Sequence, residues 1–271
     1  MRIVHIDSGR QMGGGQWQVL RLLRGLHQRG LDSILMAPTQ SPLASRAASE
    51  GFAVEKVGRR IPPADLVHVH DARSHSIAAV FARSPVVVAR RVAFPVQRGW
   101  LSRWKYGRAA HFIAVSQFVA GRLIAAGVPA DKISIVHDGV PLLPLSMRDG
   151  SVIEMTKNTS NLESDLLRAR LLVYLSEAEG LGSGALLGMS AGVPVIASRV
   201  GGLPEAIEDG INGILTSNEP ADVARCVARM EADPEMAARL GTNARRTIEE
   251  RFTVERMVDD TIAVYRRILN V

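Results

Sequence analysis

A glutamate followed by a run of glycines is the part of the sequence best suited to hold a polar ligand. The segment is Glu179-Gly180-Leu181-Gly182-Ser183-Gly184, and the pattern after it predicts a helix over residues 185–191. Glycines let backbone N–H groups approach a ligand closely, and a helix N-terminus carries partial positive charge that suits a phosphate. Because a carboxylate repels phosphate, we expect Glu179 to bind sugar hydroxyls. The alternative is that this turn only packs the helix against a sheet.

A second group of polar residues stands at the end of the strand expected over residues 65–71. It contains His68, His70 and Asp71. Side chains two residues apart on a strand share a face, so the two histidines point the same way. Such a group suggests a metal site, but the sequence holds no second cluster of ligands, and we predict that no metal is bound. Either histidine could instead have a purely structural role.

Two further patterns in the N-terminal half are typical of anion binding. Arg90 and Arg91 follow another buried strand, and paired guanidinium groups at a strand end could contact a phosphate or an acceptor molecule. Gly13, Gly14 and Gly15 form the turn between the first expected strand and the first helix. The spacing is not that of the G-x-G-x-x-G dinucleotide fingerprint, and a tight turn without a ligand is the alternative interpretation.

The elements around these motifs alternate between strand and helix. Short apolar runs without polar alternation, such as residues 171–175 and 193–197, indicate strands buried on both faces, which is the mark of a parallel sheet covered by helices. We expect these two strands at the centre of their sheet. The fold class is therefore α/β, with ligands bound at the carboxyl ends of the strands. Three amphipathic helices are expected at the end, over residues 222–231, 234–251 and 254–269.

The segments that carry these motifs resemble a known family. EGLGSGALLGMSAGVPVIAS (179–198) and GGLPEAIEDGINGIL (201–215) resemble the donor-binding half of family 4 glycosyltransferases, the group 1 retaining enzymes of GT-B fold. FIAVSQFVAGRLIAAGVPADKISIVHDGV (112–140) is similar to the end of that family's N-terminal domain. The resemblance implies two Rossmann-like domains facing a cleft: an acceptor-side domain over residues 1–142 and a donor-binding domain over 143–271. The last helix, from about residue 253, is expected to cross back to the first domain.

The same resemblance implies roles for individual residues. Glu179 and His70 would contact the donor sugar, and Arg90 or Arg91 would stabilise the leaving diphosphate together with backbone N–H groups. Those groups belong to the loop that begins at Gly180 and to Gly201 and Gly202. The reaction would move a hexose-type sugar from a nucleotide-sugar to a hydroxyl acceptor, with no metal or other cofactor. The acceptor would be a glycan, a lipid-linked molecule or a small molecule, as in cell envelope polysaccharide biosynthesis.

The sequence also departs from the family pattern. Only about 30 residues separate Gly139 from Leu171, so the second domain is expected to be shortened. The basic pair that the family places before the donor loop has no match, and the second glutamate of its motif falls on Leu187, which cannot hydrogen-bond a ribose. The alternative function is therefore a catalytically degenerate protein that binds a sugar-nucleotide or a partner protein.

Charge and composition limit the partners. The net charge is +6, and 46% of the residues are hydrophobic, as in an ordinary globular protein. A basic and aromatic segment could lie on an anionic membrane surface, or it could be a solvated loop with its aromatic residues in the core. Its residues are Arg98, Trp100, Leu101, Arg103, Trp104, Lys105, Tyr106 and Arg108. We find no nucleic-acid-binding module, and the single cysteine fits a reducing cytoplasm. An incomplete second sheet would expose an edge and favour a homo-oligomer.

Overall fold

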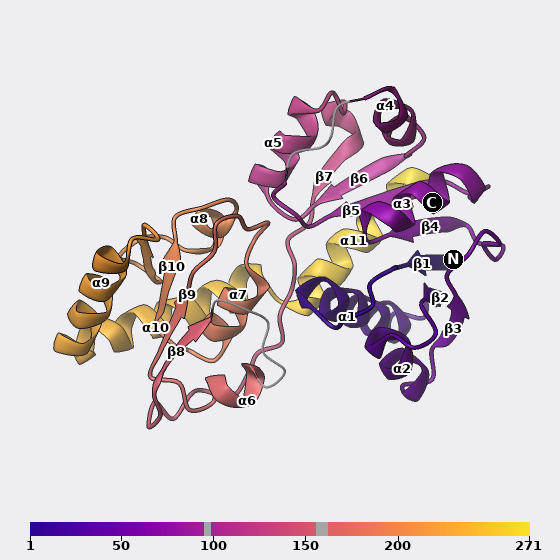
Figure 1. Cartoon of the computed structure of the whole chain (residues 1–271). Coiled ribbons are helices and arrows are strands. Elements are labelled where there is room, and N and C mark those ends of the chain that lie inside the picture. Colours follow the sequence, from indigo (N-terminus) through magenta and orange to yellow (C-terminus); the bar gives the residue numbers. More distant parts are fainter. Residues whose placement is uncertain (95–98, 156–161) are drawn as a thin grey trace. The chain divides into compact units, whose positions relative to one another are not determined.

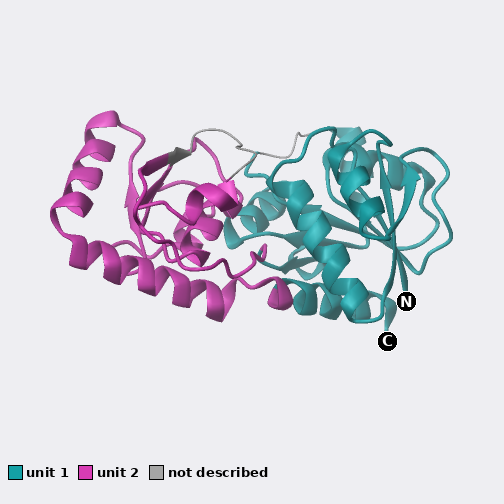
Figure 2. Ribbon diagram, turned by 90° about the horizontal axis from the view of Figure 1, so that it is seen from below, with its two compact units in different colours: residues 1–137, 257–271 teal, residues 138–256 magenta. Residues whose placement is uncertain are grey.

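The computed structural model describes residues 1–94, 99–155 and 162–271. The chain divides into two compact units, coloured separately in Figure 2. Unit 1 contains residues 1–137 and 257–271, and unit 2 contains residues 138–256. Both chain termini therefore belong to unit 1.

Unit 1 is built on a parallel sheet. Its seven described strands follow the order β3-β2-β1-β4-β5-β6-β7 (Figure 1). β1 pairs with β2 on one side and with β4 on the other, which places His5 directly opposite His68. The strands are β1 (Arg2–Ile6), β2 (Asp32–Ala37), β3 (Ala53–Lys56), β4 (Leu66–Val69), β5 (Val86–Arg90), β6 (His111–Ala114) and β7 (Ile133–Ile135).

Helices cover both faces of this sheet. Right-handed crossovers place the two helices that follow β1 and β2 on one face and the three that follow β4, β5 and β6 on the other. The C-terminal helix α11 joins the first group, since its Tyr265 contacts His68 of β4 and its Val258 contacts Gly25 of α1. The helices are α1 (Gly14–Gln28), α2 (Pro42–Ser49), α3 (Ala72–Phe81), α4 (Trp100–Gly107), α5 (Gln117–Ala125), the short 3-10 turn η1 (Ala130–Lys132) and α11 (Val254–Leu269).

Unit 2 has a smaller parallel sheet, with four described strands in the order β11-β10-β9-β8. The prediction that the apolar runs near 171 and 193 form its centre is confirmed, since β9 lies between β8 and β10, and β10 lies between β9 and β11. Leu171, Val173, Ile196 and Ile214 pack against Met230 and Leu240 of the covering helices. The elements are β8 (Val152–Met155), α6 (Leu162–Leu166), β9 (Leu171–Tyr174), α7 (Ser183–Ser190), β10 (Val195–Ser198), α8 (Leu203–Ala206), β11 (Ile214–Thr216), α9 (Pro220–Ala232) and α10 (Pro234–Arg251).

The glycine-rich segments begin their helices earlier than predicted. Gly14 and Gly15 lie in the first turn of α1, and Ser183 and Gly184 lie in the first turn of α7. Each helix is preceded by a glycine at its N-cap, Gly13 and Gly182, without a side-chain cap. Glycine has poor helix propensity, so packing of the following apolar residues sets the start of each helix.

Packing of α1 against α11 provides a first prediction. A Cβ atom at Gly25 would overlap the side chain of Val258, whereas a Cβ at Gly121, inside α5, would meet nothing within 4 Å. We expect Gly25→Ala to destabilise the protein by about 1–3 kcal/mol through overpacking, and Gly121→Ala to stabilise it by up to about 1 kcal/mol through helix propensity.

Denaturant unfolding of the two variants measures these changes. Adding Val258→Ala to Gly25→Ala should restore part of the lost stability, because it removes the overlapping methyl groups. Equal stability of the Gly25→Ala and Gly121→Ala variants would contradict close packing of α1 on α11.

Candidate functional site

The order of the strands in unit 1 defines where a ligand can bind. The chain runs outward from β1 to β2 and β3 on one side, and from β4 to β7 on the other. Loops that follow β1 and β4 therefore leave the sheet in opposite directions, and the carboxyl ends of two such strands are where open α/β sheets generally bind ligands. Asp7, Ser8, His70 and Asp71 lie at this edge. We call it the β1/β4 edge.

Asp71 joins the two loops of the β1/β4 edge. Its carboxylate accepts hydrogen bonds from the backbone N–H and the hydroxyl of Ser8, both at 2.7 Å. It also caps α3 by accepting from the N–H groups of Arg73 and Ser74, both at 2.9 Å. Burial opposes ionisation, but the hydrogen bonds from Ser74 and Ser8 hold the pKa of Asp71 below its usual value. The carboxylate thus holds the two loops together, and its lowered pKa makes it a weak base.

The loop before α1 is closed by a second carboxylate and an amide. Asp7 accepts from the N–H of Gly9 at 2.8 Å and from the side-chain amide of Gln16 at 3.2 Å. Gln16 in turn accepts from the N–H of Gly13 at 3.1 Å. Burial raises the pKa of Asp7. A Cβ at Gly15 would meet no atom within 4 Å, so close packing inside the protein does not require glycine there.

Three histidines lie together behind this edge. His5 of β1 and His68 of β4 are 0% and 1% exposed, and His70 is 9% exposed. The Nδ1 of His5 is 3.0 Å from the Nε2 of His70, and the Nδ1 of His68 is 2.5 Å from the hydroxyl of Tyr265. The prediction that His68 and His70 share a face agrees with their ring centroids, which are 4.3 Å apart. His5 completes the cluster because its strand pairs with β4.

Burial and a nearby guanidinium keep these imidazoles neutral. Burial lowers the pKa of His5 to about 3, with a further contribution from the charge of Arg91. The pKa values of His68 and His70 also lie well below the usual value, first because of burial and then because of neighbouring histidines and Arg91. One nitrogen from each histidine lies within 4.8 Å of the others. Both nitrogens of His70 already have protein partners, whereas the Nε2 atoms of His5 and His68 have none among the described residues.

The two predicted arginines have different surroundings. Arg91 approaches the Nδ1 of His70 at 3.2 Å and thus lies at the β1/β4 edge. Arg90 instead donates to the backbone carbonyl of Phe94 at 2.6 Å, which closes the turn after β5. Of this pair, Arg91 is the residue that the fold brings together with His70.

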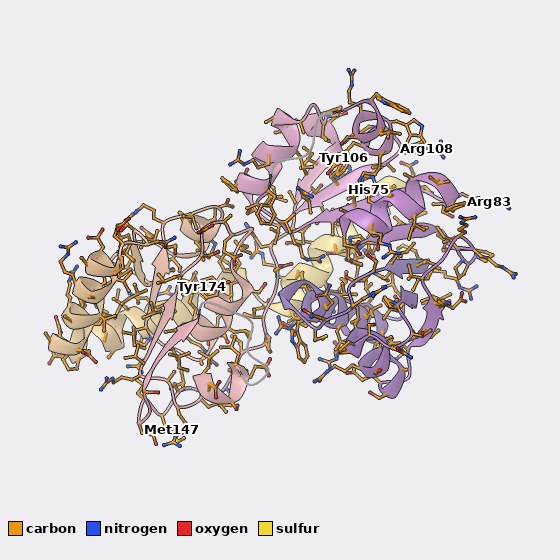
Figure 3. The ribbon with its side chains drawn as sticks, viewed as in Figure 1. His75, Arg83, Tyr106, Arg108, Met147 and Tyr174 are labelled. Carbon is orange, nitrogen blue, oxygen red and sulfur yellow. The ribbon has the colours of Figure 1, made fainter. Side chains whose placement is uncertain are left out.

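In unit 2, Glu179 lies in the loop that follows β9. Tyr174 lies at the end of β9 (Figure 3). Its hydroxyl donates a hydrogen bond to the Glu179 carboxylate at 2.7 Å. Burial raises the pKa of Glu179, as does the nearby Asp138, while the hydrogen bonds from Tyr174 and from the N–H of Gly180 partly offset this. Burial likewise raises the pKa of Tyr174. The phenol therefore remains a donor and fixes the orientation of the carboxylate.

The loop that follows β10 packs directly on the Glu179 loop. A Cβ at Gly201 would overlap the backbone of Glu179, and Gly201 has a positive φ of 58°. Both features require glycine. The N–H of Gly202 donates to the carbonyl of Glu179 at 3.1 Å, so this amide is used within the protein. The two loops form one surface at the carboxyl ends of β9 and β10.

At the start of α7, Gly182 adopts a left-handed conformation with φ of 93°. The first side chain after it, Ser183, donates to Asp138 at 3.4 Å. Leu187 is buried within the same helix, with 8% of its surface exposed. The amides of the first turn of α7 and the Glu179 carboxylate thus lie in one loop, as the sequence predicts, while Leu187 contributes only apolar surface.

Several residues of these sites were not identified from the sequence. His5 and Tyr265 lie far from His68 in the chain and join it only through strand pairing and the packing of α11. Tyr174 looks like an ordinary apolar strand residue until the Glu179 loop folds back on it. Asp7 offered a signal, since it is a carboxylate at the end of the first strand, which is where ligands of α/β proteins bind.

Comparison with solved structures identifies the class of fold. HepE from Anabaena, in complex with UDP and glucose, matches with a TM-score of 0.86 and 15% identity, covering 98% of this chain and 100% of that chain. Sucrose-phosphate synthase from Thermosynechococcus elongatus matches with a TM-score of 0.79 and 15% identity, covering 99% of each chain. The chain therefore has the GT-B fold of glycosyltransferases, in agreement with the predicted fold class.

Family models match most of the sequence. The model described as glycosyl transferases group 1 matches residues 150–247, and the model described as glycosyltransferase family 4 matches residues 12–142. These ranges contain the Glu179 loop and, at the β1/β4 edge, His70 and Asp71, whereas Asp7 and Ser8 precede them. The chain belongs to the group 1, family 4 glycosyltransferases, and the resemblance seen in the sequence is confirmed.

Curated relatives match shorter stretches. A D-inositol 3-phosphate glycosyltransferase from Streptomyces bingchenggensis is 43% identical over 98 residues, which are 36% of this chain and 21% of the relative. An N-acetyl-alpha-D-glucosaminyl L-malate synthase from Bacillus anthracis is 34% identical over 110 residues, which are 40% of this chain and 29% of the relative. The chain thus spans less than a third of the length of these two relatives.

The hydrogen bonds of Asp71 lead to a prediction about stability and pH. Asp71→Asn replaces one acceptor oxygen by an NH₂ group that opposes two of the donors, so we expect a loss of about 2–3 kcal/mol near neutral pH. Because the folded-state pKa of Asp71 is depressed, its contribution is present above the unfolded pKa of about 3.9 and disappears as the pH falls through the folded value. The variant and the wild type should therefore converge in acid.

Unfolding free energies measured from about pH 7 down to pH 3 test this. Asp32→Asn is the control, because Asp32 is 55% exposed and its ion pair with Arg2 should contribute less than about 1 kcal/mol. A gap between Asp71→Asn and the wild type that stays constant with pH would show that the charge of Asp71 is not what stabilises the edge.

Proposed function

We propose that this protein is a retaining glycosyltransferase that moves a sugar from a nucleotide-sugar to a hydroxyl acceptor in the cytoplasm. The single observation that carries the proposal is the oriented Glu179 carboxylate in a loop rich in backbone amides, inside the part of the chain that matches the group 1 family model. Membership of that family supports sugar transfer, and HepE has been crystallised with UDP-glucose.

The donor side of the reaction is assigned to unit 2. Glu179 would accept hydrogen bonds from sugar hydroxyls, because Tyr174 holds one of its oxygens and fixes the plane of the carboxylate. N–H groups in the first turn of α7 would face the diphosphate, where helix and backbone dipoles favour negative charge. Such prearranged dipoles lower the barrier by stabilising charge that develops on the leaving diphosphate.

Unit 1 would supply a cation and the acceptor site. Arg91 lies at the β1/β4 edge, where it contacts the neutral imidazole of His70 and also interacts with the Asp7 carboxylate. A phosphate of the donor or of the acceptor is the ligand that this guanidinium fits best. Gly14 and Gly15, in the first turn of α1, extend the same edge with backbone N–H groups. No residue here is required to act as a base, since the leaving diphosphate would take the acceptor proton.

We further propose that α4 contacts an anionic membrane surface, as expected for a lipid-linked acceptor of cell envelope polysaccharide biosynthesis. Trp100, Leu101 and Trp104 are 78%, 60% and 48% exposed. Tyr106, in contrast, points inward and packs on His75 with ring centroids 5.1 Å apart (Figure 3). The aromatic residues of this helix therefore divide between core and surface.

Positive charge accompanies the exposed tryptophans. Arg103 and Arg108 are exposed on or next to α4, and Arg103 and Lys132 line a cavity of about 610 Å³ between α4 and the end of α5. Lys105 is half-buried and donates to the hydroxyl of Ser76 at 3.4 Å, and Arg98 lies outside the described residues. Among the described residues, no helix is long and apolar enough to cross a bilayer, so contact would be peripheral.

A second candidate function is supported by Leu187. This position is apolar and buried where the family pattern has a glutamate, so a ribose would lose that hydrogen-bond acceptor. The protein would then bind a sugar-nucleotide, or a partner protein, without turning it over. Binding and turnover are separable in the experiment below, which therefore distinguishes the two candidates.

Nucleotide-sugar binding is the first test of the proposed function. A UDP-, GDP- or ADP-sugar present at about 100 times its dissociation constant should add about 2.7 kcal/mol of apparent stability, measurable by thermal shift. Glu179→Gln should abolish most of this gain, and Tyr174→Phe should reduce it, because each removes part of the oriented carboxylate contact. Glu177→Gln is the matched control, since Glu177 is exposed in the same loop.

The outcomes separate the candidates. Stabilisation together with release of nucleotide, and a product of unchanged anomeric configuration by NMR, is the expected result. Stabilisation without any release of nucleotide or free sugar would favour the degenerate binding protein. If no nucleotide-sugar stabilises the wild type, the active transferase is wrong, and the degenerate protein that binds a partner protein is favoured.

Membrane contact has its own test. Wild-type protein should cosediment with vesicles containing anionic phosphatidylglycerol, and binding should weaken as salt rises. The variant Trp100→Ser/Trp104→Ser should lose most of this binding, because it removes the exposed apolar surface of α4. Trp17→Phe, which changes the third tryptophan of the chain, is the control. Equal vesicle binding of the double variant and the control would rule out α4 as the contact surface.

A further inference from the structure

Hydrogen bonds at the β1/β4 edge form a chain of three side chains. Arg91 contacts the Nδ1 of His70 at 3.2 Å, and the Nε2 of His70 contacts the Nδ1 of His5 at 3.0 Å. The rings of His5 and His70 are nearly parallel, with an interplanar angle of 10°. All three residues belong to unit 1, and the two histidines are buried.

The direction of this chain follows from the chemistry of arginine. A guanidinium can only donate, so the Nδ1 of His70 must be an unprotonated acceptor. His70 is neutral, and its proton therefore sits on Nε2 and is donated to the Nδ1 of His5. The same reasoning places the proton of neutral His5 on its own Nε2. One fixed donor thus sets the tautomer of both histidines.

A consequence concerns the role predicted for His70. With one nitrogen accepting from Arg91 and the other donating to His5, neither nitrogen is available to contact a donor sugar. Arg91 also interacts electrostatically with the Asp7 carboxylate at the same edge, where burial raises the pKa of Asp7 and the charge of Arg91 partly offsets this. The hydrogen bond to His70 therefore sets the orientation of the guanidinium at the carboxyl ends of β1 and β4.

We infer that His5 and His70 are positioning residues that orient Arg91 toward a phosphate-bearing ligand at the β1/β4 edge. The inference rests on the proposed function for the identity of that ligand, but the hydrogen-bond chain itself can be tested without it. His68 and Tyr265 support the chain from behind, since the His68 ring lies 4.3 Å from that of His70 and its Nδ1 is bound to Tyr265.

The supporting cluster is costly for stability. Within the described part of the chain, neither the Nε2 of His5 nor that of His68 has a hydrogen-bond partner, although both are buried. Apolar side chains of similar size would avoid this desolvation cost. Packing alone does not favour a histidine at position 5. Its Nδ1, which accepts from His70, explains why an imidazole stands there.

The first readout is the tautomer of each histidine in the wild type. Long-range ¹H–¹⁵N NMR of protein labelled at histidine should show His70 and His5 protonated on Nε2 and unprotonated on Nδ1. His70 protonated on Nδ1 would overturn the chain, because Arg91 could not then donate to it. This measurement needs no ligand, so it stands even if no nucleotide-sugar binds.

The second readout compares two variants of His5. Asn can present an oxygen close to the position of the imidazole Nδ1, whereas Leu has no acceptor. We expect His5→Asn to keep His70 protonated on Nε2 and to bind UDP, GDP, ADP or inorganic pyrophosphate nearly as well as the wild type. His5→Leu should leave the Nε2–H of His70 without its acceptor and bind the same probe about tenfold more weakly.

Two outcomes would contradict the inference. Equal affinity of His5→Leu and wild type for a probe that Arg91→Gln no longer binds would show that His5 does not position Arg91. Stoichiometric zinc binding that shifts the ¹⁵N signals of His5, His68 and His70 together would assign the cluster to a metal instead. If His5→Leu fails to fold, the wild-type tautomers and the His5→Asn variant still decide the question.

Discussion

The reversal of strand order between β1 and β4 is the constraint on which unit 1 depends. Because the chain leaves these neighbouring strands in opposite directions, their carboxyl ends stay uncovered by connecting loops. Polar side chains lie at these carboxyl ends, and they form hydrogen bonds with one another because most surrounding positions are buried. Asp71 joins two loops at once, since it caps α3 and binds Ser8.

Both units place a half-buried charged group against a neutral partner. In unit 1, the neutral imidazole of His70 contacts Arg91, whose charge also interacts with the Asp7 carboxylate. In unit 2, the neutral phenol of Tyr174 donates a hydrogen bond to the Glu179 carboxylate. In each unit the neutral partner orients the charged group through a charge-assisted hydrogen bond.

Much of the fold could be predicted because parallel strands and amphipathic helices leave direct patterns. The buried runs at β9 and β10 and the last two helices were placed within a few residues, since apolar side chains must face the core wherever the chain folds. The starts of α1 and α7 were placed too late. Glycines do not favour a helix locally. Each helix includes them in its first turn because the residues that follow pack in helical conformation.

The sequence by itself determined the fold class, the family, the glycine-rich loops and Glu179, because these depend on residues close together in the chain. Only the tertiary structure decided which partners each of these polar residues contacts. It separated Arg91 from Arg90, which differ by one position but point to different partners. It also joined His5, His68, His70 and Tyr265, which lie as far as 260 positions apart. Hydrogen bonds between distant residues depend on strand register and helix packing, and local patterns do not encode them.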